Sequence, residues 1–172
     1  AGRRWGLWVP FAGGGGTGLV ARVRAQRVSK DIGKEVSVDN KAGAGGTRGS
    51  AEAAKAAPDA YTMLLTTSST HAISPHLMPR LPYDPIKDFT PIARIGSFAS
   101  YVGVTPDKPY QSMQALVAYA KANPGKMSYG VGNSTSHIVG EAWKKRTSTD
   151  IVRVPYRSNP AAMTDLIGGQ IQ

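Results

Sequence analysis

The sequence contains no cysteine, which excludes disulfide bonds, thiolate metal ligands and a cysteine nucleophile but leaves the compartment open. No apolar run approaches the roughly 18 residues that a transmembrane helix requires, so we expect no membrane span. The N-terminal AGRRWGLWVPF also lacks the long apolar core of a signal peptide, so either the protein is cytosolic or a signal has been removed. The 41% hydrophobic content is that of a folded protein, as one compact domain or two small lobes.

Acidic residues are few, because 11 Asp and Glu stand against 21 Lys and Arg, for a formal net charge of +10. This balance favours anionic partners, such as nucleic acid, a membrane surface, or small carboxylates and phosphates. The densest basic clusters, Arg22/Arg24/Arg27 and residues 144–146, fall on predicted helices, where a solvated face is the simpler interpretation. A nucleic-acid module stays a third hypothesis, without any recognised motif or aromatic-interleaved basic stripe.

The residue patterns typical of enzymes and metal sites are also absent. His71, His76 and His137 lie far apart, and none has a metal-ligating partner four residues on. The sequence has no Gly-x-Ser-x-Gly nucleophile elbow and no visible Ser/His/Asp arrangement. A P-loop is excluded because Gly16-Thr17-Gly18 stands where Gly-Lys-Ser/Thr is required. We therefore expect a protein that is not an enzyme and holds no metal or cofactor.

The order of predicted elements alternates strand and helix, which indicates βαβ units and parallel sheets. In the first half we expect strands at 6–11, 35–40 and 61–67, helices from Thr17 to about Lys30 and over 47–57, and irregular structure over 68–90. After an extended stretch we expect helices at 112–122, 133–147 and from Asn159, and strands at 126–132, 151–156 and 168–172. A break near 100–110 divides the chain into lobe one, 1–103, and lobe two, 104–172.

The run of glycines after the first strand satisfies the dinucleotide-binding pattern Gly13-x-Gly15-x-x-Gly18. Such sites also need an acidic residue about 20 positions on, at the end of the second strand, and Asp39 meets that condition. Four glycines in a row nevertheless satisfy many glycine patterns by accident. A Rossmann-like oxidoreductase domain therefore stays an alternative.

A distributed anion site is the other interpretation, because four strand ends lead into small or hydroxyl-rich turns. These turns are residues 12–17, 66–71, 132–137 and 156–160. In open α/β sheets, ligands bind beyond the carboxyl ends of the strands, where free N–H groups and hydroxyls suit a carboxylate. Each turn alone is more simply explained as a tight turn or a helix cap. The four together favour a shared anion cleft.

Successive blocks of the sequence resemble one family over nearly the whole chain. These blocks are VPFAGGGGTGLVAR, NKAGAGGTRGSAEAAKAAPDAYTMLLTT, PHLMPRLPYDPIKDFTPIARI, AKANPGKMSYGVGNSTSHIVGEAW and VPYRSNPAAMTDLIGGQI. They are similar to signatures of the tripartite tricarboxylate transporter substrate-binding proteins, also called Bug receptors. The LPYDP-x-x-DF-x-P and VPY…PA…DL-x-GGQ blocks are highly specific together.

The resemblance implies a periplasmic solute receptor with the type II periplasmic-binding-protein fold, in which two parallel-sheet lobes close on a small ligand. The ligand would be a di- or tricarboxylate, an amino acid or an aromatic acid, held without cofactor, metal or nucleic acid. The receptor would be a monomer that docks on the membrane permease subunits of the transporter. Carried over to this sequence, the ligand-binding residues would be Ala12, Gly13, Gly14, Gly15, Gly16, Thr17, Thr67, Ser68, Asn133, Ser134, His137, Arg157 and Ser158.

Three departures from the family pattern stand out. Gly18 occupies the place where the family usually has Asp, which removes a cap and a negative charge beside the anion site. Ala60 replaces the usual glycine of Pro-Asp-Gly-Tyr, where a positive φ would strain alanine. Family chains also continue past GGQI to complete lobe two, so we expect an incomplete second lobe, as a fragment, a proteolysed product or an unfinished sequence.

Overall fold

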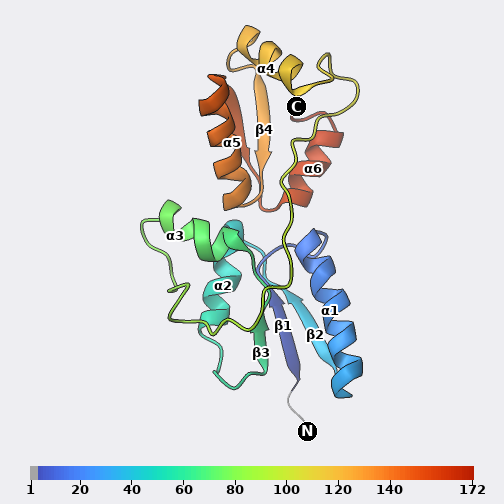
Figure 1. The fold of residues 1–172 in the computed structure, drawn as a ribbon, viewed down its shortest axis with the longest axis vertical. Helices are drawn as coiled ribbons and strands as arrows, with labels where there is room; N and C mark the ends of the chain where they lie inside the picture. Colours follow the sequence, from blue (N-terminus) through green and yellow to red (C-terminus); the bar gives the residue numbers. More distant parts are fainter. Residues whose placement is uncertain (1–3) are drawn as a thin grey trace. The chain divides into compact units, whose positions relative to one another are not determined.

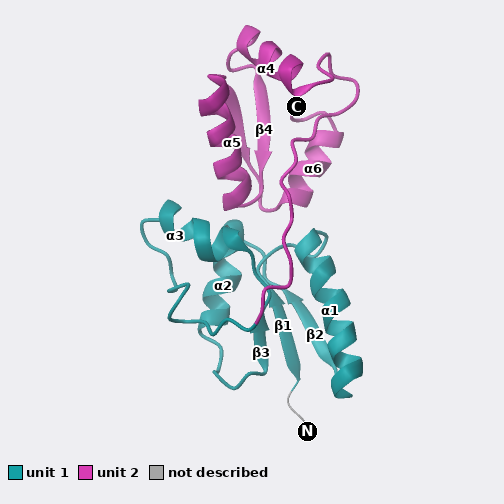
Figure 2. Cartoon of the chain, in the orientation of Figure 1, with its two compact units in different colours: residues 1–92 teal, residues 93–172 magenta. Residues whose placement is uncertain are grey.

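The computed structural model describes residues 4–172, which divide into two compact units with the boundary between Ile92 and Ala93 (Figure 2). The sequence-based division at residue 103 stays a prediction, although the structure groups the extended residues 93–103 with the second unit. The helices and strands are β1 (Trp5–Val9), α1 (Gly16–Ile32), β2 (Val36–Asn40), η1 (Ala44–Gly46), α2 (Thr47–Ala54), β3 (Thr62–Leu64), η2 (Ser69–Ile73), α3 (Ser74–Leu77), α4 (Met113–Ala122), β4 (Met127–Val131), α5 (Ser134–Thr147), β5 (Ile151–Pro155) and α6 (Asn159–Ile167).

The first unit is built on a three-stranded parallel sheet in the order β2-β1-β3 (Figure 1). Helix α1 packs against β1 and β2, and α2 packs against β1 and β3. The core contains Leu7 and Val9 of β1 together with Ala21 and Ala25, which lie four residues apart on one face of α1. Helix α1 therefore covers one face of the central strand β1, and the carboxyl end of β1 leads into the glycine run.

Helix α1 begins and ends at glycines. Its N-cap is Gly15, in an extended conformation, and its C-cap is Gly33, in the left-handed region at φ 64°. A left-handed residue after the last turn is a common helix stop because glycine adopts it without strain. The predicted helix from Thr17 to about Lys30 is thereby confirmed, with one more residue at its start and two more at its end.

Residues 69–77, predicted to be irregular, instead form the π-helix η2 and the short helix α3. Buried hydroxyl groups hold this segment: Ser74 Oγ donates to Ser69 O at 2.7 Å, and Tyr83 Oη donates to Thr70 O at 2.7 Å. The segment is helical through these tertiary contacts rather than through intrinsic propensity, which is why its composition does not predict it.

The second unit has a two-stranded parallel sheet of β4 and β5, with α5 and α6 on either side of it (Figure 1). Its core combines Tyr110, Leu116 and Ala120 with Met127 of β4 and Ile151 of β5. All four elements from α4 to β5, and the start of α6, lie within two residues of their predicted positions.

The predicted strand at 168–172 is absent. Gly169 takes φ 73°, and the amide of Gln170 donates to Asp165 O at 2.8 Å, which closes α6 with a helix stop. Ile171 is buried and the Gln172 side chain accepts from Ser128 N at 3.1 Å, so the segment packs on β4 without joining the sheet as a strand.

Candidate functional site

Three loops of the first unit meet at the carboxyl ends of its strands. In the strand order β2-β1-β3, the next strand of the chain after β1 lies on one side of β1, and the third strand lies on the other side. The loops after β1 and β3 therefore flank a topological switch point, where open α/β sheets bind ligands. Gly46, at φ 99°, lies in close contact with both of these loops. A Cβ at this position would be 2.8 Å from Phe11 Cε1 in the loop after β1 and 2.8 Å from Thr70 Cγ2 after β3. The sequence has a second glycine turn at 43–46, which we interpret together with the hydroxyl-rich loops as part of the same anion site.

The glycine loop presents backbone donors at the start of α1. Gly15 gives α1 no side-chain cap, and the first turn contains no acidic residue. The amide of Gly15 donates to Ala12 O at 3.2 Å and that of Leu19 to Gly15 O at 3.1 Å. Among residues 4–172, none accepts a hydrogen bond from the amides of Gly16 or Thr17. Helix-start donors of this kind favour an anion, both by hydrogen bonding and through the helix dipole.

The loop after β3 exposes one of its two predicted binding residues. Thr67 Oγ1 accepts from Ser69 N at 3.3 Å, so this hydroxyl already serves the local turn, whereas Ser68 is exposed. Behind them, the His71 ring packs edge-on against Phe89 at 4.6 Å between ring centroids, and burial lowers the pKa of His71. Its Nδ1 lies 2.9 Å from Thr70 Oγ1, which connects the ring to the hydroxyls of this loop.

The two predicted loops of the second unit lie against each other. A Cβ on Gly132 would come within 2.1 Å of Asn159 N, so only glycine permits this contact between the loops after β4 and β5. Asn133 caps α5 by accepting from Ser136 N at 2.9 Å in a capping box, and Ser158 caps α6 by accepting from Ala161 N at 3.4 Å.

The remaining predicted binding residues of the second unit are more exposed to solvent. Ser134 and His137 are half-buried in the first turn of α5, and Arg157 is exposed before α6. The structure thus gathers the predicted residues into one loop cluster in each unit. In the second cluster, the side chains of Asn133 and Ser158 have capping roles.

The basic clusters are partly paired on their own helices. Arg27 Nε lies 3.3 Å from Asp31 on α1, and Lys144 Nζ lies 3.6 Å from Glu141 on α5. The side chains of Arg27 and Asp31 are mostly exposed. Solvated ion pairs of this kind contribute little to the stability of the folded state. This agrees with the interpretation of these clusters as solvated helix faces.

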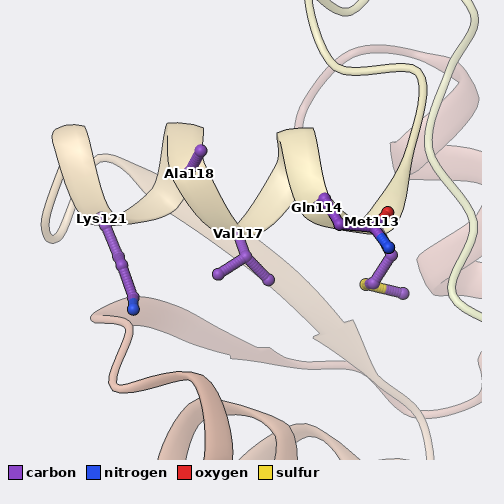
Figure 3. Close-up of a pocket in the computed structure, with 5 residues that line it drawn as sticks. All are labelled: Met113, Gln114, Val117, Ala118 and Lys121. Carbon is purple, nitrogen blue, oxygen red and sulfur yellow. The ribbon is translucent and has the colours of Figure 1, made fainter.

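Surface hollows elsewhere do not involve the predicted residues. One hollow of about 390 Å³ is lined by α4 alone, with Met113, Val117 and Lys121 projecting from one side of the helix (Figure 3). Another lies at the end of α1, around Gln26 and Glu35. Within residues 4–172 no group of three His, Cys, Asp or Glu side chains could hold a metal ion. No helix of the described chain is long and apolar enough to cross a membrane.

The chain is an α/β protein of two parallel-sheet units, and a glycine loop without a side-chain cap follows the carboxyl end of its first strand. In open α/β sheets, ligands bind at this end of the strands. Residues 20–172 match the tripartite tricarboxylate transporter family receptor, and the chain belongs to this family. It is 37% identical over 166 residues to Protein BugT of Bordetella pertussis, covering 95% of this chain and 51% of BugT. The chain therefore spans about half the length of this relative.

Solved structures of similar proteins agree with this family assignment. A structure described as a periplasmic transporter is 44% identical with a TM-score of 0.95, covering 98% of this chain and 57% of that one. The R. palustris protein Rpa4515, solved with adipate, is 34% identical with a TM-score of 0.94 and the same two coverages, 98% and 57%. The expected fold class, α/β with parallel sheets of the periplasmic-binding-protein type, is confirmed, and this chain matches only part of each longer structure.

The dinucleotide alternative finds no support. The first half of a classic dinucleotide-binding sheet has the order 3-2-1, whereas this unit has β1 between β2 and β3. At the end of β2 it is the amide of Asn40, not a carboxylate, that contacts the glycine loop, by donating to Phe11 O at 2.9 Å. Asp39 is exposed one residue earlier and pairs in register with Trp8.

Proposed function

We propose that the protein carrying this chain is a periplasmic receptor that binds a small carboxylate and delivers it to the membrane permease of a tripartite tricarboxylate transporter. It acts as a monomer and without catalysis. The observation that carries the proposal is the uncapped start of α1, whose Gly16 and Thr17 amides have no acceptor among the described residues. A family relative solved with adipate supports a carboxylate as the ligand.

The first unit supplies the main anion contacts in this proposal. Within the loop of residues 12–17, the amides of Gly14, Gly16 and Thr17 bind one carboxylate, and the exposed Ser68 adds a hydroxyl donor from the loop after β3. A short loop of unobstructed backbone suits this task, because a Cβ on Gly14 or Gly16 would meet no atom within 4 Å. Thr67 acts chiefly by shaping the loop, since its hydroxyl accepts from Ser69.

The second unit carries the other candidate contacts of the proposed receptor. The half-buried Ser134 and His137 and the exposed Arg157 are its candidate side-chain contacts. Asn133 and Ser158, which cap α5 and α6, hold these loops in place and offer the ligand their remaining polar groups. The guanidinium of Arg157 suits a second carboxylate, because its donors match two carboxylate oxygens.

Calorimetry and thermal shift test the proposal with adipate, citrate, glutamate and benzoate, and with NAD as the competing ligand class. We expect at least one carboxylate to bind with a stoichiometry of one and to raise the melting temperature, while NAD does neither. A shift with NAD and none with any carboxylate would contradict the proposal. Binding of a DNA duplex that weakens steeply between 50 and 200 mM salt would instead support a nucleic-acid module.

A further inference from the structure

Two side chains hold the carbonyl groups of the glycine loop. Arg22 Nη1 donates to Gly13 O at 2.9 Å, and its Nη2 donates to Asn40 Oδ1 at 3.0 Å. Asn40 Nδ2 in turn donates to Phe11 O at 2.9 Å. We call Arg22 and Asn40 the loop clamp, because a side chain of α1 and a side chain of β2 together fix two carbonyls of the segment that joins β1 to α1.

The clamp determines where the loop's amides point. In a trans peptide the C=O and the following N–H point in opposite directions, and the described chain has no cis peptide bond. When the carbonyls of Phe11 and Gly13 face the clamp, the N–H groups of Ala12 and Gly14 face away from it. Among residues 4–172, none accepts a hydrogen bond from the Gly14 amide.

Resting on the proposed function, we propose that Arg22 and Asn40 are positioning residues of the carboxylate site. They do not touch the ligand but hold the glycine loop in the conformation that presents its amides. A run of four glycines has more backbone freedom than any other sequence, so without the clamp the peptides at 13 and 14 could flip. Fixing them before the ligand arrives removes an ordering cost from binding.

Close packing around the clamp supports this role. A Cβ on Gly13 would lie 2.9 Å from Arg22 Nη2, and one on the buried Gly18 would lie 2.9 Å from Gly13 O. Gly14 and Gly16, by contrast, have open space where a Cβ would go. The clamp thus requires glycine at position 13 in the loop and at position 18 in the first turn of α1, whereas Gly14 and Gly16 leave the backbone open. Gly18, which departs from the family pattern, is one of those the clamp requires.

The rival explanation is that Arg22 acts only as a positive charge near the anion. Arg22 forms no ion pair among the described residues, so its charge is not neutralised by a neighbouring carboxylate. Arg24 provides the matched control, because it has the same charge on the same helix, is exposed, and its guanidinium makes no hydrogen bond within the described chain. A charge effect would also be screened in 1 M sodium chloride, where the Debye length is about 3 Å.

The experiment measures calorimetric affinity for adipate, or for the carboxylate of the screen above that binds tightest, in four variants. We expect Arg22→Ala to weaken binding about tenfold or more in both 0.1 and 1 M salt, the scale of one charge-assisted hydrogen bond. Arg22→Lys, which retains one donor for Gly13 O, should restore part of the affinity. Gly18→Ala, which changes no charge, should weaken binding several-fold, and Arg24→Ala should change it less than twofold.

The proposal is overturned if Arg22→Ala and Arg24→Ala weaken binding equally, or if the effect of Arg22→Ala disappears in 1 M salt. It is also overturned if both Arg22→Ala and Gly18→Ala bind as the parent protein does. Melting temperatures of all variants are measured alongside, so that affinity is compared between folded proteins. Failure of the parent protein to bind any carboxylate would instead contradict the proposed function itself.

Discussion

Helices of the two units begin in different ways. Helices α1 and α2 of the first unit start at Gly15 and Gly46, neither of which offers a side-chain cap. Helices α4, α5 and α6 of the second unit start at Ser112, Asn133 and Ser158, each of which accepts a hydrogen bond from its own first turn. The start of α1 in the first unit therefore has amides without an internal acceptor among the described residues, whereas each of these helix starts in the second unit has one amide paired with a capping side chain.

This contrast separates two kinds of small-residue turn that look alike in sequence. In the second unit a capping side chain stabilises the helix by about 1 kcal/mol and uses the donors that a ligand would need. In the first unit a glycine at the same place gives up that stabilisation and opens the backbone to solvent.

The largest expected effect comes from the tight glycine of the second unit. Gly132→Ala would place a Cβ 2.1 Å from Asn159 N, and we expect a loss of about 3 kcal/mol or more in unfolding free energy. The matched change in the first unit, Gly16→Ala, meets no atom within 4 Å and should leave stability nearly unchanged. Urea unfolding measures both, and equal losses would contradict the contrast between the loops.

Removal of a cap should cost the second unit about 1 kcal/mol. Asn133→Ala breaks the capping box of α5, in which Asn133 accepts from Ser136 N. The change Thr17→Ala, in the first turn of the uncapped α1, should have little effect on unfolding free energy. Urea unfolding again provides the comparison, and an Asn133→Ala variant as stable as its parent would show that this cap is not needed.

Backbone strain in the first unit gives a stabilising variant. Ala60 takes φ 64°, as the resemblance led us to suspect, and Ala60→Gly should raise the unfolding free energy by about 0.5–1 kcal/mol. Ala51→Gly, in the interior of α2, should lower it by about 1 kcal/mol. Thermal and urea unfolding distinguish the two, and a destabilised Ala60→Gly protein would refute the strain.

The smallest expected effect is the pH dependence due to His71. Burial lowers the pKa of His71 in the folded state below its ordinary value of 6.5. As the pH falls, the imidazole is therefore protonated more readily in the unfolded state than in the folded state, and the free energy of unfolding decreases. Unfolding free energy should therefore decline as pH falls from 7 toward 5, and His71→Phe should flatten the decline. His76→Gln, at an exposed position, serves as the control and should leave the slope as it is.

Much of the fold was predictable because local signals agreed with tertiary packing. Ser112 and Asn133 stand before periodic apolar residues and do begin α4 and α5, as expected. The error at 168–172 was avoidable, since Gly169 after the last turn of α6 is a recognised helix stop. The helical turns at 69–77 were not predictable, because hydroxyl groups such as Ser74 Oγ hold them through contacts within the folded unit.

The candidate site was predictable as a set of loops but not as a division of roles. By itself the sequence determined the parallel α/β arrangement and the position of the glycine loop, because strand and helix periods and glycine turns are local properties. Only the tertiary structure determined that Arg22 and Asn40 hold the carbonyls of that loop. Those contacts join residues of α1 and β2 to the loop between β1 and α1, and such distances in space are set by packing, not by sequence spacing.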